Sequence, residues 1–144
     1  MFLFNRSINV SVTKDHDHVI NIQSFLLDSH HEISLAIRVD PETDTIIYAS
    51  AELCRTLHDD CKITQELVKN LIGITFTRDI RKQIVTAIGR DKGCTHLTDL
   101  TIECVKAFKQ AKFRLMSLTL SKPELERQLR DYLVGTCFHF RVKV

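Results

Sequence analysis

The feature that most constrains the fold is the alternation of apolar and polar residues over the first third of the chain. Residues 33–39 (ISLAIRV) place all four of their large aliphatic side chains on one side of an extended backbone. The same pattern runs through residues 8–12, 19–27 and 45–51. The connecting segments, 28–31 and 41–44, are too short for a parallel crossover. We therefore expect an antiparallel meander of four strands in the N-terminal half.

After Leu53 the apolar period changes to three and four residues, which is typical of amphipathic helices. The stripe predicts a helix at 62–72 that stops at Gly73, and a long central helix from Thr95 to about Leu118. Two further helices have start signals: one capped by Thr77 and ending at Gly89, and one opened by the Ser121–Glu124 capping box and ending near Gly135. Strands followed by helices predict an α+β fold, an antiparallel sheet with helices packed on one face.

The C-terminal residues 136–144 (TCFHFRVKV) alternate again, so we expect them to form a closing strand of the same sheet. No repeat, low-complexity segment or linker interrupts the chain. A length of 144 residues is near the common size of one domain, and we expect a single domain over residues 1–144.

Composition narrows the class of protein without naming a function. Lys and Arg total 20 against 18 for Asp and Glu, and the basic residues are scattered, so nucleic acid is not implied as a partner. The apolar runs are far shorter than the ~20 residues of a spanning helix, and the first residues have no export-signal pattern. We expect a cytoplasmic protein that does not bind membranes. A protein partner or a small molecule fits this composition equally well.

The five cysteines are then reduced thiols, metal ligands or core residues rather than a disulfide framework. The most informative of these cysteines is Cys94, in the segment Gly93-Cys94-Thr95-His96-Leu97. Gly93 permits a positive φ or a close backbone approach, and a helix start favours a thiolate at Cys94. His96 can share a metal with that thiolate, although a packed cysteine and a solvent-facing histidine explain the pattern too. Cys104 falls on the apolar helix stripe, where a core role is expected.

Several of these residues resemble a known family. The GCTHL segment before a long helix, the L-x-D-x-x-H-x-I pattern at 26–33, Cys61 ahead of a Leu-x-Gly helix end, and a late Cys-Phe pair at Cys137 are similar to the bacterial domain-of-unknown-function family 2889. The family is uncharacterised, so the resemblance implies matched positions rather than an activity. The matched positions are Asp28, His31, Cys61, Cys94, His96 and Cys137. This chain has residues 55–60 (RTLHDD) in place of the family's proline-rich approach to the first cysteine.

Cys61, Cys94, His96 and Cys137 have the composition of a Cys3His site, with Asp28 or His31 as outer support or as an alternative ligand. Such a site favours zinc and is compatible with iron or an iron–sulfur cluster, and the element order is similar to that of iron–sulfur scaffold proteins. The leading hypothesis is a small metal- or cluster-binding accessory protein. The alternatives are a thiol-based enzyme with Cys94 as nucleophile and His31 or His96 as base, and a non-catalytic ligand-binding or interaction module.

Overall fold

The computed structural model describes residues 1–142. The chain divides into two compact units, Met1–Phe108 and Lys109–Val144, and each is described by itself. That the whole chain, 1–144, is one domain stays a prediction.

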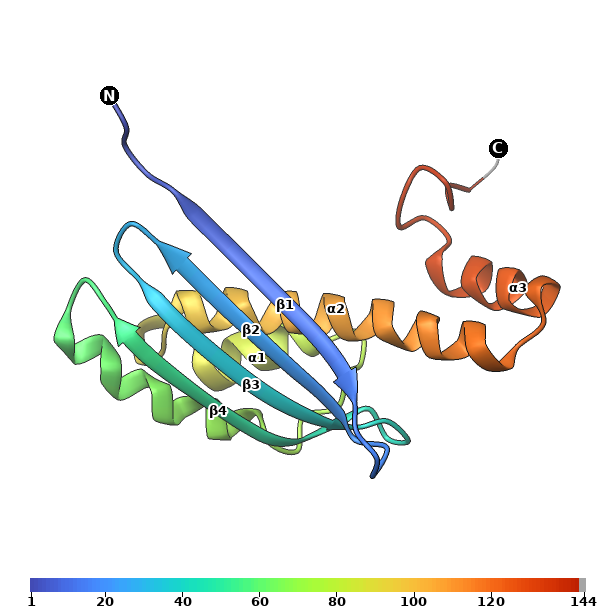
Figure 1. Cartoon of the computed structure of the whole chain (residues 1–144), viewed down its shortest axis with the longest axis horizontal. Coiled ribbons are helices and arrows are strands. Elements are labelled where there is room, and N and C mark those ends of the chain that lie inside the picture. The colour runs from blue at the N-terminus through green and yellow to red at the C-terminus, as the bar shows by residue number, and fades with distance from the viewer. Residues whose placement is uncertain (143–144) are drawn as a thin grey trace. The chain divides into compact units, whose positions relative to one another are not determined.

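The N-terminal unit begins with a four-stranded antiparallel meander, as the alternation predicts. Its strands pair in the order β1-β2-β3-β4 (Figure 1). They are β1 (Arg6–Lys14), β2 (Ile20–Asp28), β3 (Glu32–Asp40) and β4 (Thr45–Arg55). The expected antiparallel sheet is confirmed.

One face of this sheet forms the core. In β2 and β3 every second side chain is buried, and the register sets Ile22 opposite Ile37 and Leu26 opposite Ile33 on the same face. The alternate side chains point away from the core, and Phe25 is half exposed there. Burial of one face only is what period-two patterning requires.

Helices pack on the buried face of the sheet, as expected for an α+β fold (Figure 1). They are the 3-10 helix η1 (Asp59–Leu71), α1 (Ile80–Ile88), the short 3-10 helix η2 (Arg90–Lys92) and the first half of α2 (Thr95–Thr119). The Cys104 thiol on α2 donates a hydrogen bond to the Ser24 hydroxyl on β2 at 3.1 Å. Burial raises the pKa of Cys104 to about 11, which fits its expected core role.

Helix ends follow the sequence signals only in part. α1 ends at Ile88 with Gly89 as its C-cap, as predicted, but its N-cap is Asp79 rather than Thr77. The Thr77 hydroxyl instead accepts a hydrogen bond from the Gln83 amide at 3.2 Å. Ser121 is the N-cap of α3 (Lys122–Leu133), yet its side chain makes no capping hydrogen bond.

The C-terminal unit corrects one prediction. Residues 134–142 form turns and irregular chain, so the closing strand expected at 136–144 is wrong for all the described part of that segment, and residues 143–144 lie outside the described residues. Local hydrogen bonds explain the difference: the Gly135 N–H donates to the Phe140 carbonyl and the Thr136 N–H to the Leu133 carbonyl. Gly135 has a φ of 77°, which turns the chain back after α3. These backbone groups are therefore occupied within the tail itself.

Within residues 1–142, no helix combines the length and the apolar character needed to cross a membrane.

Candidate functional site

A buried carboxylate organises the turn between β2 and β3. Asp28 is the last residue of β2 and continues its inward-facing set, so its side chain is fully buried. Its Oδ1 accepts hydrogen bonds from the backbone N–H groups of His30 and His31 at 2.8 and 2.7 Å. Its Oδ2 accepts from the Arg6 guanidinium at 2.7 and 3.0 Å. Burial alone would raise the pKa of this carboxyl, but these donors outweigh it and hold the pKa well below the usual range.

The same carboxylate fixes the tautomer of His31. Nδ1 of His31 lies 3.0 Å from Asp28 Oδ1. Since an ionised carboxylate only accepts hydrogen bonds, Nδ1 must carry the proton. In the neutral ring, Nε2 is then left with a free lone pair, which is the form that binds a metal or accepts a proton.

His96, in the first turn of α2, lies beside His31 of the β2–β3 turn. The ring centres are 4.0 Å apart and the ring planes are inclined by 36°. The pKa of His96 is lowered first by partial burial and then by His31 and Arg6. These effects favour the neutral form of the ring. One ligand atom each from Asp28, His31 and His96 lie within 4.8 Å of one another.

The two histidines line a pocket of about 330 Å³ together with two of the predicted cysteines. Cys61 comes from η1 and Cys94 from the residue just before α2. The remaining lining residues are Ile33, Leu53, Thr56, Leu57, His58, Thr64, Gly93 and Thr95. The structure thus brings four predicted site residues, from three separate segments, to one pocket.

The backbone just before Cys94 requires a glycine. A Cβ at Gly93 would lie only 2.0 Å from the Ile88 carbonyl oxygen, so close approach, rather than a positive φ, requires glycine here. The Cys94 N–H donates to that same carbonyl at 2.9 Å, and the Cys94 carbonyl accepts from the Thr98 N–H at 3.0 Å. Both backbone groups of Cys94 are therefore tied to the ends of α1 and α2.

Of the predicted metal ligands, Cys137 is the one that does not line the pocket. It is exposed and belongs to the C-terminal unit, whereas every lining residue of the pocket comes from Met1–Phe108. Its membership of a common site stays a prediction.

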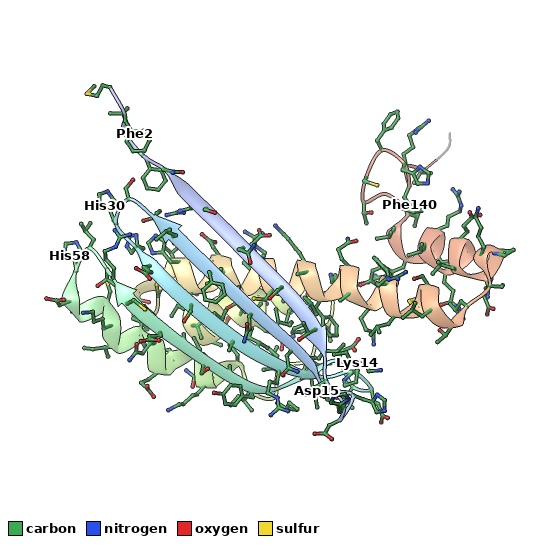
Figure 2. The ribbon with its side chains drawn as sticks, in the orientation of Figure 1. Phe2, Lys14, Asp15, His30, His58 and Phe140 are labelled. Carbon is green, nitrogen blue, oxygen red and sulfur yellow. The ribbon has the colours of Figure 1, made fainter. Side chains whose placement is uncertain are left out.

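Sequence reasoning missed two residues at this end of the sheet. His58 lines the pocket from the loop after β4, and Figure 2 shows it at the same end of the sheet as His30. The Arg55 guanidinium donates to the carbonyls of Asp28 and Ser29 at 2.9 and 3.0 Å, which holds the β2–β3 turn against the end of β4. Both residues lie in a polar stretch with no periodic signal, so nothing in the sequence marked them.

Comparison with known proteins adds a family but no activity. A family model described as "Protein of unknown function (DUF2889)" matches residues 4–110 of the 144. This range includes all the pocket residues and ends before Cys137. No curated protein and no solved structure matches the chain. The similarity to iron–sulfur scaffold proteins remains an analogy of element order.

Proposed function

This chain belongs to the DUF2889 family of proteins of unknown function, and from its pocket we propose that it binds a divalent metal ion, with zinc favoured over iron. The donors are Nε2 of His31, one ring nitrogen of His96, and the thiolates of Cys94 and Cys61. Two nitrogens and two sulfurs form a common tetrahedral zinc set, and iron accepts the same ligand types. Cys137 remains an alternative sulfur donor that this proposal does not require.

One observation carries the proposal: His31 is held by a carboxylate on one nitrogen while its ring lies 4.0 Å from the ring of His96. A carboxylate–histidine pair is the usual outer support of a metal-ligating imidazole, because it fixes the ring and strengthens the other nitrogen as a ligand. The lowered pKa of His96 favours its neutral ring, which is the form that supplies a second nitrogen ligand.

Asp28 serves better as support than as a ligand. Both of its oxygens are occupied by hydrogen bonds from Arg6, His31 and the turn backbone. Direct coordination would break some of these bonds inside a buried site, at a cost of about 1.5–3 kcal/mol for each bond to the charged group.

The histidines lie near the spacing that one ion requires. Two nitrogens bound to one zinc at ~2.1 Å can be no more than about 4.2 Å apart. The ligand atoms of the Asp28, His31 and His96 group lie within 4.8 Å of one another. Cys61 and Cys94 line the same pocket but are not part of this close group, so their thiolates must move toward the histidines to complete the ligand set.

The test is metal content and affinity in matched variants. Protein purified without oxygen should contain about one zinc or iron per chain by elemental analysis. His96→Gln should lower zinc affinity by at least tenfold in a chelator competition, whereas His16→Gln, in the exposed β1–β2 turn, should leave it unchanged. The proposal would be rejected if the wild-type protein contained no metal after purification and bound zinc no more tightly than His96→Gln does.

A second candidate function has support from the same hydrogen bond. The Asp28–His31 pair is also the arrangement of a histidine base held by a carboxylate, and Cys94 lines the same pocket as a candidate nucleophile. Iodoacetamide labelling separates the two functions. The metal proposal predicts that added zinc protects Cys94, while fast labelling without zinc protection would favour the thiol enzyme. Cys104, buried and with a raised pKa, is the internal unreactive control.

A further inference from the structure

The two edges of the sheet are protected to different degrees. β4 is covered: the Ile46 N–H donates to the Ile74 carbonyl at 2.9 Å, and the Ile46 carbonyl accepts from the Gly73 N–H at 2.8 Å. η1 also reaches β4, because the Leu53 N–H donates to the Gln65 side chain at 3.4 Å. β1, at the other edge, has a hydrogen-bonded neighbour on one side only (Figure 1). Within the N-terminal unit, no strand pairs with its second edge.

The free edge of β1 carries the backbone groups of its even-numbered residues. The Ser29 N–H donates to the Asn5 carbonyl at 3.1 Å, so the backbone groups of Asn5 face β2. These directions alternate along an antiparallel strand. The N–H and C=O groups of Ile8, Val10 and Val12 therefore point away from β2, where another strand can form hydrogen bonds with them.

The sequence of β1 has none of the usual defences of an edge strand. Natural sheet edges are commonly protected by a charged residue, a proline or a bulge. Residues 7–13 (SINVSVT) contain no charge and no proline, and their register against β2 is unbroken. Four of these seven side chains are β-branched, which suits a paired strand. β1 is therefore built to accept a further strand.

The core side of β1 is also incompletely covered. Ile8 and Val12 lie opposite Leu26 and Ile22, which are each 1% exposed. Ile8 itself is 41% exposed, and Val12 is half-buried. A strand added beside β1 would remove part of this aliphatic surface from water, which favours the addition.

We propose that a second copy of this chain adds its own β1 to this edge, so that the two sheets join across a two-fold axis. The described residues of the C-terminal unit, 109–142, contain no strand that could take this place. A two-fold interface requires a self-complementary surface, and β1 presents aliphatic side chains on one face and small polar ones on the other. A net charge of +2 gives little repulsion between copies. This inference does not depend on the metal site.

Charge selects the register of the pairing. With Val10 on the two-fold axis, Arg6 would lie opposite Lys14 of the second copy, and like charges directly opposite each other are unfavourable. A shift that sets Asn9 on the axis removes this conflict and places Ile8 opposite Val10 of the second copy. The two Asn9 residues then form a non-hydrogen-bonded pair, with Cα atoms ~4.5 Å apart.

The test measures self-association of the full-length protein by analytical ultracentrifugation. A reversible dimer should form. Asn9→Lys and Asn9→Asp, at an exposed position, should each weaken it roughly tenfold, because like charges then face each other across the axis. Mixing the two variants should restore a dimer. Tyr48→Lys is the matched control, because Tyr48 is exposed on the same face of the sheet but in β4, and it should leave dimerisation unchanged.

Amide hydrogen exchange identifies the surface that pairs. On dimerisation the amides of Ile8, Val10 and Val12 should become protected, whereas that of Asn9, which faces β2, should change little. Val10→Pro removes an outward N–H without breaking a bond to β2, so it should give a folded monomer by circular dichroism and ultracentrifugation. A wild-type protein that stays monomeric at every concentration, or a dimer without protection of these three amides, would overturn the second copy as the occupant of this edge.

Discussion

In each of the two hairpin turns at opposite ends of β2, an aspartate carboxylate accepts hydrogen bonds from nearby residues. The surroundings of the two carboxylates differ. In the β1–β2 turn, Asp15 Oδ1 accepts the Val19 N–H at 2.9 Å and Oδ2 accepts the Asn21 amide at 3.0 Å. In the β2–β3 turn, Asp28 accepts two backbone N–H groups and an arginine. Figure 2 shows Asp15 and His30 at opposite ends of the sheet.

Burial is what separates the two turns. The Asp15 side chain is 32% exposed and its arginine, Arg38, is 3.6 Å away, whereas the Asp28 side chain is fully buried and Arg6 is 2.7 Å away. The Asp15 hydrogen bonds therefore shape a solvated turn. The Asp28 hydrogen bonds compete with little water, so they can hold His31 in one orientation.

The largest expected effect of this difference is on stability. Asp28→Asn should lower the free energy of unfolding by about 2–4 kcal/mol, because it removes a buried charge from Arg6 and from the turn amides. Asp15→Asn should change it little. Chemical denaturation of both variants measures the comparison, and equal losses would show that burial does not distinguish the two turns.

Asp28 should also contribute more than Asp15 to the pH dependence of stability. The folded-state pKa of Asp28 lies well below its unfolded value near 3.8. The unfolded chain therefore binds more protons between these two values, and stability falls as pH drops below about 4. In Asp28→Asn this acid decline should be shallower than in Asp15→Asn when unfolding is followed by circular dichroism from pH 5 to 2. A decline of the same slope in both variants would contradict this assignment.

The smallest effect concerns the arginines. Arg55→Lys should cost about 1 kcal/mol or less, because an ammonium group cannot bind the Asp28 and Ser29 carbonyls as a fork. It should also weaken zinc binding through a looser His31. Arg38→Lys at the other turn should change neither quantity. Thermal melts and the chelator competition on the two variants test this pair, and a loss of zinc affinity in Arg38→Lys would remove the distinction.

The strands were predictable because their apolar residues alternate in the sequence. Burial alternates strictly in β2 and β3, whereas β1 is largely exposed and the β3–β4 pairing contains register shifts. The closing strand at 136–144 was not, because alternation does not show whether a partner strand is available. The N–H groups of Gly135, Thr136 and Arg141 instead form local hydrogen bonds. Ser121 illustrates a similar limit: the motif placed the start of α3 correctly, but the side chain does not make the expected bond.

The sequence predicted four of the residues that line the pocket, but not how they contact one another. The spacing around Cys94 and His96 marked a helix start, and the family resemblance added Asp28, His31 and Cys61. The histidine pair depends on contact between residues 65 positions apart in the chain, which local patterns do not encode. The segments 15–18 (DHDH) and 28–31 (DSHH) have similar sequences. Only the folded structure shows that Asp28, in the second segment, is buried.

The most direct measurement of the central claim is the X-ray absorption spectrum of zinc-loaded protein. We expect a four-coordinate ion with nitrogen ligands at ~2.0–2.1 Å and sulfur ligands at ~2.3 Å. In His31→Ala a nitrogen contribution should be lost and in Cys94→Ser a sulfur contribution, while His16→Gln leaves the spectrum unchanged. A spectrum with only oxygen ligands, or one that is the same in His31→Ala and the wild type, would contradict this ligand set.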